Sequence, residues 1–492
     1  MIQTNAHFTI TDKNLDRLYE SAKNTLFASI KSFGDRKLLV DAPNSNTSTL
    51  NYSLMSAETL ADYDLGVALD SVNAFLLTLR KDGRLPSSLA REGGAILPRY
   101  DILTGFSFAE EALRLCYLAK NKNSSYSKRL YEVLGLFDEY LWTRHDLNAN
   151  GCLEIFDETD SEEGAASGRF PNLTMIKNGE EHTASPFPVE TYDLMAEAYC
   201  VRKTLSELAL LLGMPEESAA WQGKADAVKE KIGDFFWLGG FHACFDRDYR
   251  GSIISTLSIN NLLLLYFGAI GDESAQEIVQ NHIRNPEEFW TPMPLPTLAA
   301  NQSQYDAHSE LCGPPRGVTY RRAIRAFEKY GYYASVTEIG QKLLQATGAK
   351  NQFPVCFDTV TGEPLNTDTQ SAYTPTASAV LEVIKRFWGV YTDRDTVCWG
   401  CLGHENATSE YRFTWGNDTY LAETEDGITT GSINGDRIFT VTAGTRVFTD
   451  IHGTSVRVAN ATPKPIDCIC VCRDRTYSMH LEPNETKEIQ KS

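Results

Sequence analysis

The residues most able to do chemistry lie in two segments that lack helical periodicity, 144–187 and 285–317. The stretch 142–170 is the richest, and Arg169 near its end follows a group of carboxylates. Seven acids fall within eighteen residues: Asp146, Glu154, Asp157, Glu158, Asp160, Glu162 and Glu163. Interspersed apolar residues predict a folded, partly buried element, with a solvated acidic loop as the alternative. Two carboxyl groups that flank a sugar linkage can act as general acid and general base.

Several single residues could contact a ligand, although each also has a structural interpretation. Asp64 precedes the apolar segment 65–79, so it either caps a helix or binds a ligand. Asp358 precedes Thr-Val-Thr-Gly, a turn in which Asp commonly caps. Arg169 could pair with the nearby acids for structural reasons. Trp290 could stack on a sugar ring or simply pack against its neighbours.

The acidic stretch also contains a partial calcium-binding pattern. Asp146, Asn148 and Asn150 alternate before Gly151, and Asp157 is the twelfth residue counted from Asp146. This spacing fits a calcium loop, except that Asp replaces the final bidentate Glu. Because no second such loop follows, a tight Asx/Gly turn is the favoured interpretation and calcium the alternative. We expect no other metal and no cofactor.

Two kinds of periodicity divide the chain. Three-four spacing of apolar residues predicts helices between about residues 12 and 388, the first of them capped by Thr11 or Asp12. Segments 65–79 and 257–268 are so apolar that we expect them in an inner layer of helices. The further helices are predicted at 57–80, 105–120, 125–143, 188–213, 215–235, 257–270, 273–284, 318–330, 332–347 and 372–388. Residues 396–490 show period-two runs punctuated by turn pairs such as Asn434-Gly435, which predicts a small antiparallel β-sandwich.

Composition limits the partners. The chain has 492 residues, 42% of them hydrophobic, and a formal net charge of −19. Such an acidic chain repels phosphate backbones and anionic membranes, and we find no basic patch, so we expect no nucleic-acid or membrane partner. No apolar run reaches the length of a membrane-spanning helix, and no signal peptide begins the chain. The eleven cysteines lie scattered in apolar segments, which is typical of reduced, buried thiols and a cytoplasmic protein.

The order of several motifs resembles the six-hairpin (α/α)6-barrel glycosidases, a group of trehalases, processing α-glucosidases and mannosylglycerate hydrolases. The run from Arg144 to Glu154, followed by Ser-Gly-Arg169-Phe, is similar to the element that contains their catalytic acid. The resemblance spans roughly residues 55–390. Further pieces follow in the family's order: Asp62-Tyr63-Asp64, Phe241 to Asp248, Phe289-Trp290 to Thr297, Cys312-Gly313-Pro314, Phe357-Asp358 to Gly362, and Ala372-Tyr373-Thr374.

Three positions depart from the family's pattern. The resemblance places the family's acid at Ala165 and its base at Val355, and neither side chain can transfer a proton. The arginine of its sugar-binding loop becomes Cys312, although Arg316 lies close enough in sequence to replace it. Glu163 or Glu162 could supply the acid instead and Asp358 the base. Alternatively, the scaffold carries different chemistry, or the protein binds a sugar without cleaving it.

The sequence therefore predicts a mainly α protein, an (α/α)6 toroid over residues 1–392 with a β-sandwich over 393–492. We expect inverting hydrolysis of an α-glycosidic bond in a small glucoside or oligosaccharide, within a funnel formed by the loops of the inner helices. Glu163 and Asp358 are the predicted catalytic pair. The predicted sugar-binding residues are Tyr63, Asp64, Arg169, Trp290, Gly313 and Arg316. A catalytically silent sugar-binding protein and a polysaccharide lyase are the alternatives.

Overall fold

The computed structural model describes the chain in several ranges, and every structural statement below refers to them. These are residues 2–93, 95–103, 105–120, 124–157, 160, 174–177, 180–308, 312–365, 371–404, 406–473 and 475–489. The side chains of 174–177 and 180–186 are not described.

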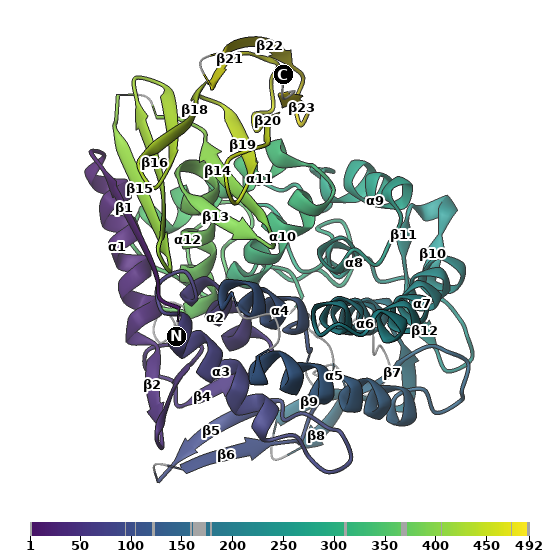
Figure 1. Ribbon diagram of the computed structural model, residues 1–492. Coiled ribbons are helices and arrows are strands. Elements are labelled where there is room, and N and C mark those ends of the chain that lie inside the picture. Colours follow the sequence, from purple (N-terminus) through teal and green to yellow (C-terminus); the bar gives the residue numbers. More distant parts are fainter. Residues whose placement is uncertain are drawn as a thin grey trace.

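An inner ring of six helices forms the centre of the molecule (Figure 1). Each helix contacts the next one in the ring, and the last contacts the first, so the ring is closed. Its members are α2 (Tyr52–Leu60), α4 (Ala109–Leu118), α6 (Tyr192–Leu211), α8 (Asn261–Phe267), α10 (Gly317–Lys329) and α12 (Thr374–Trp388).

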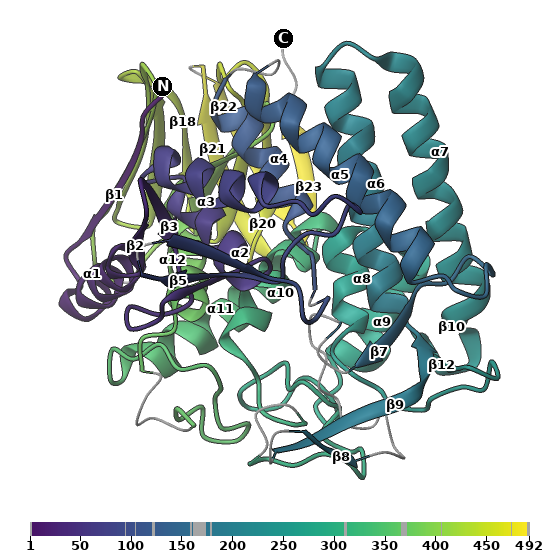
Figure 2. The ribbon, with the colours of Figure 1, turned by 90° about the horizontal axis from the view of Figure 1, so that it is seen from below.

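An outer layer of helices surrounds this ring, as Figure 2 shows for the outer helices α5 and α7, which lie on either side of the inner helix α6. Each outer helix packs on an inner neighbour in sequence or, for the first, on α12. The outer helices are α1 (Lys13–Ala28), α3 (Leu65–Leu77), α5 (Ser125–Arg144), α7 (Pro215–Lys231), α9 (Asp272–Ile278) and α11 (Tyr333–Gly348). Helical hairpins that alternate between an inner and an outer layer confirm the predicted (α/α)6 toroid.

The helix predicted over 57–80 is in fact two helices, α2 and α3. They separate at residues 61–64, where Asp64 caps α3 by accepting a hydrogen bond from the backbone N–H of Val67 at 3.1 Å. The prediction that 65–79 belongs to the inner layer was wrong. The segment is apolar because α3 packs on α2 on one side and is covered by β3 (Arg36–Leu39) on another. The inner placement of 257–268 is confirmed by α8, whose residues are all buried.

Short strands lie between the helices, and the sequence analysis did not predict them. Strand β2 (Ile30–Phe33) pairs with β3, and β9 (Glu180–Glu190) runs directly into α6. The others are β4 (Thr47–Thr49), β5 (Ser88–Glu92), β6 (Ala95–Arg99), β7 (Glu154–Asp157), β8 (Thr174–Lys177), β10 (Trp237–Leu238), β11 (Ala243–Cys244) and β12 (Arg247–Asp248). Strands β7, β8 and β12 all pair with β9, at the end of the barrel drawn at the bottom of Figure 2.

The C-terminal region folds into two antiparallel sheets of seven and five strands. The first contains β1 (Thr4–Ile10), β15 (Ser409–Trp415), β16 (Asp418–Glu425), β17 (Ile428–Ile433), β18 (Asp436–Thr442), β21 (Ile466–Cys472) and β22 (Arg475–Leu481). The second contains β13 (Val390–Asp393), β14 (Thr396–Cys401), β19 (Thr445–Asp450), β20 (Val456–Asn460) and β23 (Thr486–Ile489).

One strand of the larger sheet comes from the opposite end of the chain. Strand β1 pairs along its whole length with β15, from Thr4 opposite Trp415 to Ile10 opposite Ser409. Its residues alternate strictly between buried and exposed, which is the pattern of a strand with one face on a core. At the predicted turn, Asn434 and Gly435 both have positive φ, 54° and 89°, as a tight hairpin turn requires.

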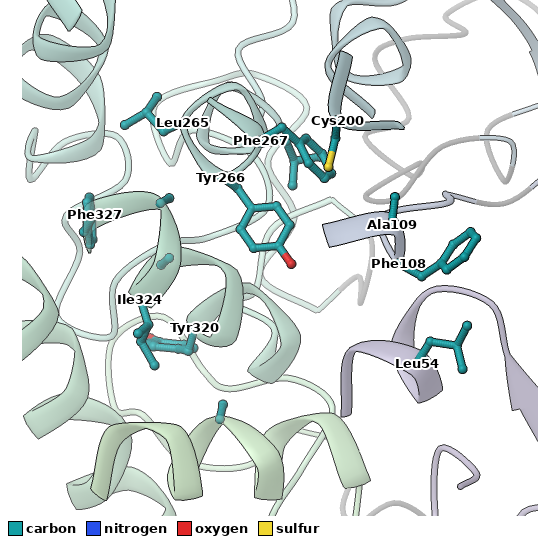
Figure 3. Close-up of a cluster of buried hydrophobic side chains, with 14 of the residues drawn as sticks. Leu54, Phe108, Ala109, Cys200, Leu265, Tyr266, Phe267, Tyr320, Ile324 and Phe327 are labelled. Atoms are coloured by element: carbon teal, nitrogen blue, oxygen red, sulfur yellow. The ribbon is translucent and has the colours of Figure 1, made fainter. Parts of the chain in front are cut away.

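Apolar side chains from neighbouring inner helices pack together inside the ring. Figure 3 shows Leu54 of α2, Ala109 of α4, Tyr266 of α8 and Ile324 of α10 in this cluster. All eleven cysteines are free and buried, which confirms that they pack as small apolar side chains. Across the part of the chain that the structure describes, every helix is too short or too polar to span a lipid bilayer.

Buried charges also line the axis of the ring. Glu58 of α2 bonds Arg321 and Arg325 of α10, and Arg114 of α4 at 3.2 Å. Burial raises the pKa of Glu58, but the three guanidinium groups outweigh burial and lower it to about 2. Lys385 of α12 continues the network toward Asp62 and Glu382. These ion pairs therefore link α2 to α4 and α10, and α12 to the segment that follows α2.

Candidate active site

Five polar side chains meet where α2, α10 and α12 begin. We call Asp41, Tyr52, Arg316, Arg322 and Tyr373 the entrance cluster. Arg316 Nη1 donates to Tyr52 Oη at 3.2 Å, and the guanidinium groups of Arg316 and Arg322 lie 5.4 and 5.6 Å from the Tyr52 ring centroid. Burial raises the pKa of Tyr373, Asp41 and Tyr52 raise it further, and the two arginines oppose the rise. The other four groups thus each lie within electrostatic reach of Tyr373.

A close approach of two helices brings the cluster together. A Cβ on Gly317, the first residue of α10, would lie 1.8 Å from Thr376 Oγ1 in the first turn of α12. Only glycine permits this contact. The Gly317 N–H donates to Val355 O at 2.8 Å, and Thr376 Oγ1 donates to Pro354 O at 2.6 Å. The segment at 353–355 therefore runs beside the starts of α10 and α12.

Asp41 is a hydrogen-bonded carboxyl group with a raised pKa. Its Oδ1 accepts hydrogen bonds from Ser53 Oγ at 2.6 Å and Thr49 Oγ1 at 3.0 Å. Among the described residues, no hydrogen bond reaches Oδ2. Burial raises the pKa of Asp41 from 3.8 to about 6, and the two hydroxyl groups only partly oppose this rise. Asp41 O also accepts the Thr374 N–H at 2.8 Å, which fixes the residue beside the start of α12.

A second group of acids lies where α4, α6 and α8 begin. Glu197 Oε2 accepts the Phe106 N–H at 2.7 Å, and Asp193 Oδ2 accepts Asn260 Nδ2 at 2.7 Å. Both acids are buried. Because every inner helix begins at the same end of the ring, this group and the entrance cluster lie at the same end of the barrel.

The acidic loop after α5 forms a tight turn. Asp146 accepts the N–H groups of Asn150 and Gly151 at 3.0 and 3.1 Å, and Asn148 Oδ1 also accepts the Asn150 N–H at 3.0 Å. Glu190 accepts the side-chain amides of Asn148 and Asn150. These bonds are those of the Asx/Gly turn that the sequence analysis favoured. Within the described ranges, no group of three or more His, Cys, Asp or Glu is arranged to hold a metal. The calcium alternative, with Asp157 as its last ligand, stays a prediction.

The structure describes only one of the two predicted catalytic residues. Glu163 lies outside the described residues, as do the predicted binding residue Arg169 and Ala165. Asp358 is described, and its Oδ1 accepts three hydrogen bonds, from the N–H of Val360 and from the N–H and Oγ1 of Thr361. These bonds lower the pKa of Asp358. The carboxylate therefore stabilises its own turn.

Most predicted binding residues lie apart from the entrance cluster. Tyr63 and Asp64 follow the far end of α2, about 13 Å along the helix axis from Tyr52. Tyr63 packs against Phe27 of α1, with ring centroids 6.1 Å apart. Of the predicted set, Arg316 alone among the described residues belongs to the cluster.

Trp290 and Gly313 make packing contacts in the loop region that precedes α10. The guanidinium of Arg284 stacks 4.2 Å from the Trp290 ring and bonds Glu338 of the outer helix α11. This contact leaves that face of Trp290 covered. Gly313 N donates to Thr297 Oγ1 at 2.9 Å, and a Cβ there would lie 2.3 Å from Asp306 O. Both residues therefore have clear packing roles.

The match to a family model extends over most of the barrel. Residues 50–374 match the mannosylglycerate hydrolase MGH1-like glycoside hydrolase domain. The chain belongs to this glycoside hydrolase family, as the sequence resemblance indicated. Tyr52, Arg316, Arg322 and Tyr373 fall inside the matched range, whereas Asp41 precedes it. No curated protein matches the sequence.

Solved structures share the fold at low sequence identity. The GH63 mannosylglycerate hydrolase from Thermus thermophilus, in complex with glucose, is 18% identical with a TM-score of 0.60, over 74% of this chain and 99% of that one. The neutral trehalase Nth1 from Saccharomyces cerevisiae is 14% identical with a TM-score of 0.52, over 72% and 74%. An α-L-rhamnosidase from Dictyoglumus thermophilum is 14% identical with a TM-score of 0.57, over 90% and 47%. The barrel ends at Trp388, so a match to the rhamnosidase over 90% of the chain must include part of the sandwich.

Proposed function

We propose that this protein hydrolyses an α-glycosidic bond in a small glucoside or oligosaccharide, with inversion at the anomeric carbon. The observation that carries the proposal is Asp41, a carboxyl group of raised pKa at the end of the ring where the inner helices begin. It acts electrostatically on Tyr373, as do Tyr52, Arg316 and Arg322. Hydroxyl, guanidinium and carboxyl groups together suit the hydrogen bonding of a sugar ring. The family match supports carbohydrate as the substrate class.

Asp41 is proposed as the general base. Its carboxylate removes a proton from water, the water oxygen attacks the anomeric carbon, and the bond to the leaving oxygen breaks. The leaving oxygen takes a proton from the second carboxyl group, for which Glu163 remains the proposed acid. Val355 stands at the position of the family's base, and its carbonyl oxygen accepts the N–H of Gly317 at the start of α10. The carbonyl oxygen of Asp41 accepts the N–H of Thr374 at the start of α12. A carboxyl from another part of the chain thus takes over the missing role, in preference to Asp358.

The experiment is turnover of a panel of α-linked disaccharides and aryl α-glycosides, followed by proton NMR. We expect the β-anomer to appear first, because inversion places water on the face opposite the leaving group. Asp41→Asn should lower kcat by roughly 10²–10⁴-fold, the usual contribution of a positioned acid or base. Addition of azide to Asp41→Ala should give a β-glycosyl azide, a product that no purely structural role explains.

Asp450 offers a matched control for this substitution. Its carboxylate also accepts hydrogen bonds from a serine and a threonine, Ser455 Oγ at 2.9 Å and Thr454 Oγ1, but it lies in the sandwich. Asp450→Asn should leave kcat within about threefold. Initial release of the α-anomer would refute inversion, and an Asp41→Asn variant as active as wild type would refute the role of Asp41.

A sugar-binding protein without turnover is the second candidate. The observation that favours it is Val355, an apolar side chain in the segment beside Arg316 and Gly317 where the resemblance places the catalytic base. Calorimetry with the same disaccharides separates the two candidates. Heat of binding without any released monosaccharide supports the silent protein and contradicts the hydrolase.

A further inference from the structure

Two hydroxyl groups bind the same oxygen of Asp41. Thr49 is the last residue of β4, and Ser53 lies in the first turn of α2. Ser53 Oγ donates to Asp41 Oδ1 at 2.6 Å, and Thr49 Oγ1 donates to Oδ1 at 3.0 Å. Ser53 is fully buried, whereas Asp41 keeps partial exposure. The carboxyl group is therefore held at one of its two oxygens.

Thr49 and Ser53 also fix each other. The Thr49 N–H donates to Ser53 Oγ at 2.9 Å, and the Ser53 N–H donates to Thr49 Oγ1 at 3.1 Å. Because each hydroxyl oxygen accepts a backbone N–H, its single proton points to another acceptor. The other acceptor near the Thr49 hydroxyl, Ser53 Oγ, is 3.5 Å away and thus farther than Asp41 Oδ1. The reciprocal pair therefore directs two protons at Asp41.

This arrangement makes the two oxygens of Asp41 different. Among the described residues Oδ2 receives no hydrogen bond, and rotation of the carboxyl group would break both bonds at Oδ1. Hydrogen bonds favour negative charge on the oxygen that accepts them, so a proton is taken up at the other oxygen. The backbone is fixed as well, because Asp41 O accepts the Thr374 N–H at 2.8 Å.

We propose, given that Asp41 is the general base of the proposed function, that Ser53 and Thr49 are positioning residues, which hold Oδ1 so that Oδ2 takes the proton from water. When the O–H bond of water breaks, the proton forms a bond to Oδ2, and the electron pair stays on the oxygen that attacks the anomeric carbon. Neither hydroxyl group touches the sugar in this assignment, because each acts through Asp41.

The same two bonds affect the ionisation of Asp41. Burial raises its pKa to about 6, and the bonds from Ser53 and Thr49 oppose this rise. Loss of either hydroxyl should therefore raise the pKa of Asp41 further, so that the carboxylate forms only at higher pH. The titratable and charged side chains that share this place, and that these substitutions leave intact, are Tyr52 of α2, Arg316 and Arg322 of α10, and Tyr373 beside α12.

Carbon-13 NMR of the full chain, labelled at the aspartate carboxyl carbons, measures the pKa of Asp41 without any need for turnover. Its resonance is the one that Asp41→Asn removes. Ser53→Ala should raise this pKa by about 1, the effect of one hydrogen bond to a charged group. The acidic limb of the kcat/KM profile should move to higher pH by the same amount, which lowers kcat/KM about tenfold at pH 5.

The plateau of the profile tests the orientation of the carboxylate. At pH 8 Asp41 is ionised in wild type and in Ser53→Ala alike. We expect kcat to fall several-fold there while KM stays the same, because the carboxylate is no longer held in one orientation. A role in stability alone would leave both constants of the folded protein unchanged.

Matched variants separate the loss of a hydroxyl from the loss of packing. Ser56 is a buried serine of the same helix whose Oγ has no hydrogen-bond partner among the described residues. Ser56→Ala should therefore change neither the pKa of Asp41 nor the kinetics. Thr49→Val removes a hydroxyl but keeps the shape of the side chain, and should act as Ser53→Ala does, whereas Thr49→Ser should keep the wild-type pKa. Thermal unfolding checks that each variant folds.

The pKa of Asp41 and the kinetics together distinguish the outcomes. A higher pKa in Ser53→Ala and Thr49→Val, followed by the acidic limb and by the loss of kcat at pH 8, supports the proposal. An unchanged pKa or an unchanged kcat at pH 8 overturns the positioning role and leaves the function of Asp41 standing. A raised pKa with an unmoved acidic limb refutes Asp41 as the base and the positioning role with it. If Ser53→Ala does not fold, Thr49→Val against Thr49→Ser decides.

Discussion

Replacing Asp41 by Asn should make the protein more stable at neutral pH. Folding raises the pKa of this carboxyl from 3.8 to about 6, chiefly through burial, so the folded state resists its ionisation. A difference of about two pKa units corresponds to about 3 kcal/mol, at ~1.4 kcal/mol per unit. The side chain keeps some contact with solvent, so we expect a measured gain of about 1–2 kcal/mol. An Asn Oδ1 can still accept the bonds from Ser53 and Thr49.

The stability difference between wild type and Asp41→Asn should depend on pH in a defined direction. Well below pH 3.8 the carboxyl is protonated in both the folded and the unfolded state, so wild type and Asp41→Asn should unfold at similar urea concentrations. As the pH rises from about 4 to about 6, ionisation stabilises the unfolded state first, and wild type loses stability relative to the variant. Above pH 6 the gap should stay constant. Urea unfolding followed by tryptophan fluorescence at pH 4, 5, 6 and 7 measures it.

Asp450→Asn should change the stability in the opposite direction. Burial raises the pKa of Asp450, but hydrogen bonds from Thr454, His452 and Ser455 outweigh burial and lower it. The folded state therefore favours the ionised form, and its amide variant should be less stable than wild type at pH 7. A gap between Asp41→Asn and wild type that does not change with pH, or a less stable Asp41→Asn at pH 7, would refute the reasoning.

Two further substitutions probe how the ring is held. Gly317→Ala should lower the thermal midpoint by an amount equivalent to about 1–3 kcal/mol, because the new Cβ would collide with Thr376. An unchanged midpoint would show that α10 and α12 can separate freely. Glu58→Ala should destabilise the protein by about 3–5 kcal/mol in urea unfolding, because it leaves Arg321 and Arg325 buried without their carboxylate. A loss below about 1 kcal/mol would mean that water compensates those charges.

The sequence contains enough periodicity to predict the toroid and the sandwich. The start of α1 after Asp12, where the Asp12 side chain accepts the N–H of Asn14 and Leu15, follows directly from local capping chemistry. The division between α2 and α3 could not be read from periodicity, because α2 is almost wholly buried and α3 is apolar along most of its length, so neither shows much contrast between faces. Most of the strands between the helices were missed for a related reason, since runs of two to five residues carry too little pattern; β9, with eleven residues, is the exception.

The candidate site was harder to predict than the fold. Arg316 lies near one motif of the family resemblance, and Tyr373 belongs to another. Asp41 belongs to no motif. Its proposed role rests on its burial, on two hydroxyl groups eight and twelve residues away, and on the distant Tyr373. Such a site is assembled by long-range packing of loops. The acidic stretch drew attention by composition, but its described part consists of turn-stabilising carboxylates.

Strand β1 has a consequence for how the molecule is made. Its partner β15 begins at Ser409, so the ribosome must add roughly four hundred residues after β1 before the hydrogen bonds between the two strands can form. Contacts of such high sequence separation close late in folding. Until then β1 is an unpaired strand, open to the wrong partner in crowded surroundings. The larger sheet of the sandwich is therefore completed only when synthesis is nearly finished.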